Sequence, residues 1–203
     1  IVRGVATRYE TDVLDSSWRT TATWPLPGIP SRSRISPDGS LVATTAFVTG
    51  HSYAQVGFST ETTIHKADGT DLGSLEDYAL TVDGKPYTAS DRNFWGVSFV
   101  DDDTFYATGA SQSANATWLL KGSVSARTLT AFRSGGECPS ISPDRAHLAY
   151  KKVVRTDAGQ KVWAYAVLTL ATGTETLYDV TAGCDDQIEW LDATTILYGM
   201  ARA

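Results

Sequence analysis

One short phrase recurs four times along this chain, and each copy is followed at once by a run typical of a β-strand. The copies are Ser36-Pro37-Asp38-Gly39, Phe99-Val100-Asp101-Asp102, Ser142-Pro143-Asp144-Arg145 and Trp190-Leu191-Asp192-Ala193. Their second positions are 63, 43 and 48 residues apart. A period of this length, with strand-like runs between the copies, is typical of β-propeller blades. The repeat therefore predicts an all-β β-propeller of four-stranded antiparallel blades.

The phrase itself is interpreted as a tight turn between the first two strands of each blade. Proline fixes φ for such a turn, aspartate bonds back to the backbone, and glycine accepts a positive φ. We therefore expect the recurring aspartates to form turns and not to act in catalysis. They are Asp38, Asp101, Asp144 and Asp192.

The repeat divides the chain into three full blades flanked by two partial ones. The full blades are predicted at 31–93, 94–133 and 134–182, with outer strands of a preceding blade at 1–30 and inner strands of a fourth at 183–203. In the first full blade we expect the outer strand at 71–82, followed by an insertion through residue 93.

This count fits two arrangements. The two partial blades pair and close a ring of four, or the chain is part of a larger ring. We favour the larger ring, because an open strand edge at the end of the chain invites aggregation. Ile1 opens the sequence without a start methionine or a signal peptide, which predicts a processed or truncated segment of a longer chain.

The charge of the chain narrows the classes of partner. The formal net charge is −6 and the pI is about 5.0. An acidic protein is poorly suited to nucleic acid, which requires a basic face, or to an anionic membrane surface. No apolar run is long enough to span a bilayer.

These repeats resemble the TolB-like propeller family, whose blades carry a Ser-Pro-Asp-Gly signature between their first two strands. Ser36–Gly39 and Ser142–Asp144 match closely, with Arg145 in place of the glycine, whereas Val100 and Leu191 replace the proline elsewhere. The sequence around these repeats is similar to actinobacterial exported TolB-like proteins. That likeness is carried by the stretches Gly57–Thr60, Asn93–Val97, Glu137–Ser140 and Glu189–Asp192.

The resemblance implies a propeller, an extracellular or cell-envelope location, and binding instead of catalysis. The matched motif is a structural turn, so it transfers no site residues from the family.

The two cysteines, Cys138 and Cys184, each precede the first strand of a predicted blade. Neighbouring blades place these strands side by side, so we expect a disulfide between them. Closing a loop of about 46 residues contributes about 3–4 kcal/mol by the loop-entropy relation, and a disulfide fits export. The alternative is two separate buried thiols. Two cysteines without nearby histidines give too few ligands for a zinc site, and we expect no cofactor.

Acidic residues gather in the loops that lead from one blade into the next. Asp91, Glu137, Asp185 and Asp186 lie in these loops, and Gln187 extends the densest group. Such loops surround one mouth of the central channel, where we expect carboxylates to bind a cation or a basic peptide, or to repel anions. The alternative is solvated loop charge. Arg34, with Arg32, comes from the equivalent part of the first blade and neutralises the carboxylates from the opposite side.

Two further residues are candidates at the same mouth. Trp95 starts the inner strand of the second blade, where an aromatic ring packs between blades or stacks on a ligand. His51 lies in a loop facing the acidic group, with an exposed loop histidine as the alternative.

These observations favour a non-enzymatic propeller that binds a protein or peptide partner at the channel mouth. The alternatives are a propeller-based hydrolase or lyase, and a scaffold domain of a larger multidomain protein. The sequence contains no Gly-x-Ser-x-Gly motif, no His-Glu-x-x-His motif and no cluster of histidine with carboxylates. It therefore shows no recognised catalytic motif.

Overall fold

A computed structural model of the chain describes residues 7–50, 57–157, 160–178 and 187–199. These residues are almost entirely β-structure, with one 3-10 turn at Leu75–Asp77 and no α-helix in the described ranges. None of the described segments forms a helix that could cross a membrane. Four residues singled out in the sequence, His51, Cys184, Asp185 and Asp186, lie outside these ranges.

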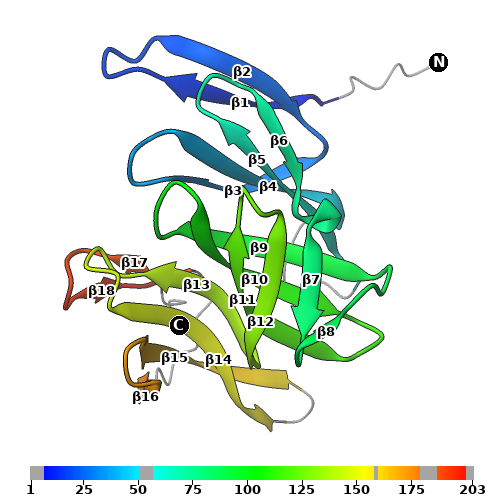
Figure 1. Cartoon of the computed structure of the whole chain (residues 1–203), viewed down its shortest axis with the longest axis vertical. Helices are drawn as coiled ribbons and strands as arrows, with labels where there is room; N and C mark the ends of the chain where they lie inside the picture. The colour runs from blue at the N-terminus through cyan, green and yellow to red at the C-terminus, as the bar shows by residue number, and fades with distance from the viewer. Residues whose placement is uncertain (1–6, 51–56, 158–159, 179–186, 200–203) are drawn as a thin grey trace.

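The first part of the chain forms a hairpin and a four-stranded antiparallel sheet (Figure 1). The hairpin pairs β1 (Tyr9–Leu14) with β2 (Thr20–Leu26). The sheet, which we name blade I, has the strand order β3 (Ile29–Ile35), β4 (Leu41–Thr49), β5 (Ser59–Lys66) and β6 (Asp71–Ser74).

Two further sheets and a short hairpin follow. Blade II contains β9 (Arg92–Phe99), β10 (Thr104–Ser111), β11 (Ala116–Ser123) and β12 (Thr128–Ser134). Blade III contains β13 (Gly136–Ile141), β14 (His147–Asp157), β15 (Gln160–Thr169) and β16 (Thr174–Tyr178). The last hairpin pairs β17 (Glu189–Trp190) with β18 (Ile196–Leu197).

The sheets follow one another so that their first strands pack together, which is the arrangement of a β-propeller. Strand β9 contacts β3 on one side and β13 on the other, and β13 contacts β17. Gly96 makes one of these contacts possible: its φ is +67°, and a Cβ there would lie 3.1 Å from the Cα of Cys138. The prediction of an all-β propeller with four-stranded antiparallel blades is therefore confirmed.

The recurring phrase forms the same turn in blades I and III. In blade I the Ser36 hydroxyl donates to the Asp38 carboxylate (2.6 Å) and accepts from the N–H of Leu41 (2.9 Å). In blade III the Ser142 hydroxyl donates to Asp144 (2.6 Å) and accepts from His147 N–H (2.9 Å).

The two degenerate copies keep only the aspartate part of the turn. Asp101 accepts from the N–H of Thr104 (2.6 Å), and Asp192 accepts from the N–H of Thr194 (2.7 Å). All four aspartates are therefore turn formers, as predicted from the sequence.

The outer part of blade I differs from the single strand expected over 71–82. Strand β6 ends at Ser74, whose hydroxyl accepts from the N–H of Glu76 and caps the 3-10 turn. The chain then leaves blade I, and β7 (Ala79–Val82) pairs in parallel with β12 of blade II. Strand β8 (Lys85–Pro86) completes this added hairpin, so the sheet of blade II has six strands.

Apolar side chains fill the spaces between the sheets. Ile64 of blade I packs with Phe94 and Phe105 of blade II in one buried cluster. Leu119 of blade II packs with Leu148 of blade III in a second cluster. Burying a large apolar side chain contributes about 1.5–3 kcal/mol, so contacts between sheets, and not only within them, hold the blades together.

A polar cluster joins the outer strands of blades II and III. Glu175 of β16 accepts from Arg133 of β12 (2.8 Å) and from Lys152 of β14 (2.5 Å), and also from the Tyr150 hydroxyl. The side chain of Glu175 is 16% exposed. A largely buried carboxylate is tolerated only when it is paired, as it is here.

Candidate functional site

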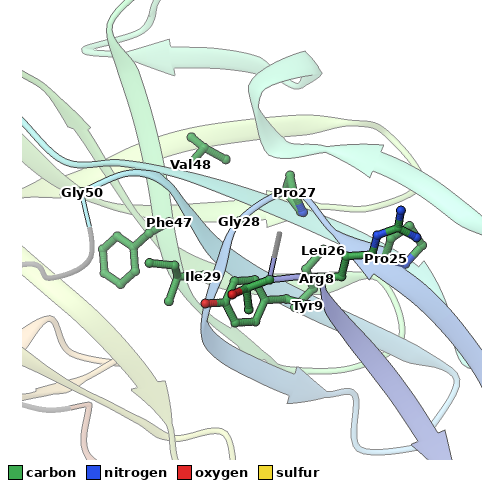
Figure 2. A pocket seen from close by; sticks show the side chains of 11 residues that line it. Arg8, Tyr9, Pro25, Leu26, Pro27, Gly28, Ile29, Phe47, Val48 and Gly50 are labelled. Atoms are coloured by element: carbon green, nitrogen blue, oxygen red, sulfur yellow. The ribbon is translucent and has the colours of Figure 1, made fainter. Parts of the chain in front are cut away.

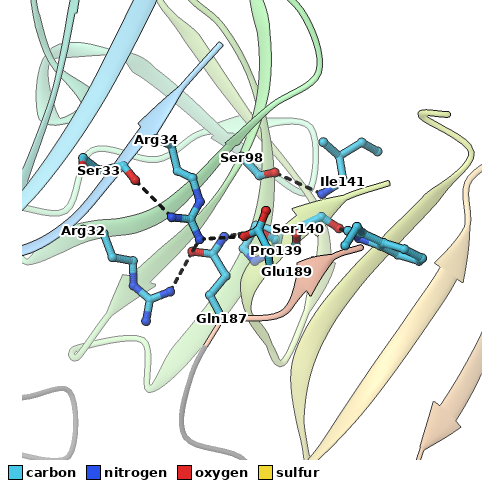
Figure 3. A network of polar contacts seen from close by, with 10 residues as sticks. Arg32, Ser33, Arg34, Ser98, Pro139, Ser140, Ile141, Gln187 and Glu189 are labelled. Carbon is cyan, nitrogen blue, oxygen red and sulfur yellow. Dashed lines mark hydrogen bonds and ion pairs between the residues drawn. The ribbon is translucent and has the colours of Figure 1, made fainter. Parts of the chain in front are cut away.

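A network of polar side chains connects the inner strands of blade I, blade III and the last hairpin (Figure 3). The side-chain oxygen of Gln187 accepts from Arg32 (2.7 Å) and from Arg34 (3.3 Å), both on β3. The Gln187 amide donates to the carbonyl oxygen of Pro139 on β13 (2.5 Å). Gln187 is 7% exposed, so these hydrogen bonds form in a site largely shielded from water, where losing a partner is costly.

The outer edge of this network is an ion pair. Arg34 lies 3.3 Å from the carboxylate of Glu189, and the two side chains are 34% and 64% exposed. Pairs this exposed contribute about 0–1 kcal/mol. The buried amide of Gln187 therefore fixes the geometry, while the ion pair sets the charge at the surface.

A cavity of about 280 Å³ opens at the end of the inner strands where the recurring turns lie. Each unit contributes to it: Pro37 from blade I, Val100 from blade II, Pro143 from blade III and Glu189 from β17. We name it the turn cavity. Its complete lining is Pro37, Phe99, Val100, Ile141, Ser142, Pro143, Arg145, Glu189 and Trp190.

The turn cavity is mostly apolar, with charge at two positions. Trp190, one of its walls, donates from its indole N–H to the carbonyl oxygen of Ser140 (3.0 Å), which fixes the ring against blade III. Glu189 belongs both to the cavity and to the network in Figure 3. The arrangement is a rigid apolar depression with ionic groups, suited to an apolar group that carries a polar neighbour.

A larger cavity of about 530 Å³ lies between the N-terminal hairpin and blade I (Figure 2). Tyr9, Leu26, Ile29 and Phe47 supply apolar surface, and Arg8 is the one ionic group among its lining residues. It involves only the hairpin and blade I, so it brings together fewer parts of the fold than the turn cavity does.

Two of the residues predicted for the site are brought together. Arg34 and Gln187 share a hydrogen bond (3.3 Å) although they come from opposite ends of the chain. Asp91 lies apart from them, in the loop before β9. It accepts from the N–H of Ser113 (2.6 Å) and from the Ser111 hydroxyl (3.0 Å), and the hydrogen bond from Ser113 N–H is the main cause of a lowered pKa.

Glu137 lies at the start of β13, opposite Lys151 of β14. Burial raises the pKa of Glu137, and the ammonium groups of Lys151 and Lys161 oppose that rise. Asp91 and Glu137 thus belong to the starting end of their inner strands, whereas the turn cavity lies at the other end.

Trp95 and Cys138 are both buried, with 3% of each residue exposed. The Trp95 ring packs edge-on against Phe58, with 5.4 Å between ring centroids, so it fills the space beside blade I. Cys138 forms no disulfide with any residue in the described ranges, and burial raises the pKa of its thiol.

The remaining candidates stay predictions. His51, Asp185 and Asp186 lie outside the described ranges, and so does Cys184, the proposed disulfide partner of Cys138. Among the described residues, no three His, Cys, Asp or Glu side chains are grouped as a metal ion would require.

The sequence reasoning missed the turn cavity, although its signal was present. Pro37, Val100 and Pro143 are the second positions of the recurring phrase, and they were assigned to turns alone. Equivalent positions of neighbouring blades meet around the axis, so the repeat that predicts the fold also marks the lining. Arg145 was visible as the residue that replaces the glycine of the phrase, whereas Glu189 carried no separate signal.

No protein-family model matches the sequence, and no curated protein matches it. Among solved structures, the chain is similar to a puromycin-hydrolysing peptidase of Mycobacterium tuberculosis, at 13% identity and a TM-score of 0.59, over 91% of this chain and 27% of that one. It also matches the β-propeller domain of the Trilobed protease from Pyrococcus furiosus, at 12% identity and a TM-score of 0.43, over 78% of this chain and 45% of that one. The chain thus spans about a quarter of the length of the peptidase and under half of the length of the Trilobed protease propeller chain.

Proposed function

We propose that this propeller domain binds a protein or peptide partner at the turn cavity, without chemical conversion of it. The observation that carries the proposal is that all three blades and β17 place side chains around one depression. The turns that form it are held by internal hydrogen bonds such as Ser142 to Asp144 (2.6 Å). Loops fixed on a rigid scaffold are suited to recognition.

The turn cavity is large enough for one anchoring side chain of a peptide. Its volume of about 280 Å³ lies at the lower limit of the range of about 300–1,000 Å³ typical of small-molecule sites. A single large side chain of a partner fits such a depression, and a few anchors of this kind carry most of the energy of a protein interface.

The chemistry of the lining residues supports binding as well. The one hydroxyl nucleophile among them, Ser142, donates to Asp144 and accepts from His147 N–H within its own turn. Hydrogen bonds from Ser142 and from the N–H of Ala146 lower the pKa of Asp144, which makes this carboxylate a weak base, whereas a catalytic serine needs a base that takes its proton. Export to the cell envelope and kinship with TolB-like proteins are part of the same proposal, and they rest on the sequence resemblance.

The experiment is selection of binders from a random peptide display library, followed by affinity measurement on variants. Pro143 is exposed, so Pro143→Glu places a charge in the turn cavity without disturbing the core. The matched control is Pro86→Glu, an exposed proline on β8. We expect selected peptides to bind the wild type and Pro86→Glu equally and Pro143→Glu at least about tenfold more weakly, which corresponds to about 1.4 kcal/mol. Failure to select any peptide, or equal binding to all three proteins, would contradict the proposal.

A second candidate is a scaffold domain within a larger hydrolytic protein. The length relation favours it, since the chain matches only 27% of a peptidase. Two results together would favour this candidate. The full-length gene product would show hydrolase activity that persists when the propeller carries Pro143→Glu, and the display library would yield no binding peptide.

A further inference from the structure

Arg145 occupies a backbone position that an arginine rarely adopts. Its φ is +61°, and the equivalent residue of the same turn in blade I is Gly39, with a φ of +75°. In both turns the backbone N–H of this residue donates to the carbonyl oxygen of the serine three positions earlier, from Arg145 to Ser142 (2.8 Å) and from Gly39 to Ser36 (2.9 Å). A glycine therefore meets the backbone requirement of this turn. An arginine at the same position carries the conformational cost of a positive φ.

A second arginine with a positive φ, Arg127, makes contacts that explain its presence in a turn. Arg127 has a φ of +52° in the turn before β12. Its guanidinium donates to the carbonyl oxygen of Leu72 (2.6 Å) and lies over the Tyr78 ring, 5.0 Å from the centroid. The side chain of Arg127 thus fastens the crossing from blade I to blade II, which accounts for its presence.

The side chain of Arg145 has no such role among the described residues. It is exposed, it makes no hydrogen bond or ion pair with any residue in the described ranges, and it lines the turn cavity. The guanidinium is thus placed beside an apolar depression without a hydrogen bond or ion pair to any described residue.

The acidic groups around Arg145 already have other partners. Glu189, on the same cavity, is paired with Arg34 at 3.3 Å. Asp101 is near enough for Arg145 to help lower its pKa, but hydrogen bonds from the backbone are the larger cause. Its carboxylate accepts from the N–H of Thr104 (2.6 Å) and of Asp103 (3.0 Å). The charge that Arg145 presents to the cavity is therefore open to a ligand.

We propose that Arg145 is a specificity-determining residue of the turn cavity, which selects peptides with a carboxylate next to the apolar anchor. This inference rests on the proposed function and names the partner's chemistry. Guanidinium binds carboxylate through two parallel N–H···O hydrogen bonds, stronger than neutral ones. The carboxylate comes either from an Asp or Glu side chain or from the free C-terminus of the peptide.

The test is an array of synthetic peptides of equal length, each with one large apolar residue at its centre. The neighbouring position is Asp or Glu, Asn or Gln, or Lys or Arg, and each peptide is made with a free and with an amidated C-terminus. Binding is measured by fluorescence polarisation on the wild type, Arg145→Gly, Arg145→Lys and the control Arg127→Gly, with folding checked by circular dichroism.

We expect acidic or free-carboxylate peptides to bind the wild type at least about tenfold more tightly than their neutral counterparts. Arg145→Gly abolishes this preference, Arg145→Lys keeps part of it, and Arg127→Gly leaves it unchanged. Loss of the preference on amidation alone identifies the C-terminal carboxylate as the source. Binding that is lost in Pro143→Glu but shows no acidic preference would overturn this inference and leave the proposed function standing. No binding by any peptide would overturn both.

Discussion

The guanidinium of Arg34 and the carboxylate of Glu189 lie 3.3 Å apart, although blade I and the last hairpin are separated by most of the chain. Beside this ion pair, the buried amide of Gln187 joins β3 to β13. Blade I and the last hairpin therefore meet through side chains and not through a shared sheet, since β3 and β17 belong to different sheets.

Replacement of Gln187 should destabilise the protein more than its size suggests. Gln187→Ala removes hydrogen bonds to Arg32, Arg34 and the carbonyl oxygen of Pro139 in a buried site. Leaving such groups unsatisfied costs about 1–3 kcal/mol, so we expect the free energy of unfolding in urea to fall by about that amount.

The control for this substitution is Gln112→Ala, in an exposed turn of blade II. Surface changes of this kind stay within about 0.5 kcal/mol. Equal effects of the two substitutions would show that the network around Gln187 does not hold the blades.

Arg145→Gly should make the protein more stable, in contrast to its expected effect on binding. The positive φ costs an ordinary residue roughly 1–2 kcal/mol, whereas the extra freedom of glycine in the unfolded chain costs roughly 0.5–1 kcal/mol. We expect a net gain of roughly 0.5–1 kcal/mol in urea unfolding. Arg127→Gly should gain less or lose stability, because it also removes the hydrogen bond to Leu72. A loss of stability in Arg145→Gly would show that its side chain supports the fold.

The recurring turns should make stability fall at acidic pH. Hydrogen bonds from Ser36 and Ser40 lower the pKa of Asp38 from 3.8 to about 2. A carboxyl group whose pKa is lowered in the folded state stabilises it above the unfolded pKa, and this contribution is lost as the pH falls from about 4 to about 2. The pKa values of Asp101, Asp144 and Asp192 are shifted in the same direction.

Urea midpoints measured across this range should therefore decrease below pH 4, and Asp38→Asn should show a smaller decrease than the wild type. Asp102→Asn serves as the control, because the Asp102 carboxylate makes no hydrogen bond among the described residues. A pH dependence that Asp38→Asn leaves unchanged would assign the acid sensitivity to other groups.

The blades were predictable because their turns are local. The hydroxyl of Ser36 and the carboxylate of Asp38 meet within one short phrase, so composition and order determine the contact. The pairing of β7 with β12 was not predictable in this way, because it joins segments about fifty residues apart in parallel, and the break at Leu75–Asp77 gives only a weak signal.

The candidate site was predictable in part. Arg34 and Gln187 were both expected near the axis, but the hydrogen bond between them spans 153 residues and leaves no trace in local sequence. The turn cavity was missed because each turn was interpreted singly, whereas the cavity exists only where Pro37, Val100 and Pro143 come together.

The hairpin of β7 and β8 has a consequence for how the molecule comes apart. It is covalently part of the segment that follows blade I, yet its backbone hydrogen bonds belong to blade II. When β12 separates from its sheet, β7 loses its pairing partner, and β7 belongs to the segment that leaves β6. We therefore expect the first two blades to unfold as one cooperative unit, so that protection from amide hydrogen exchange changes together across both.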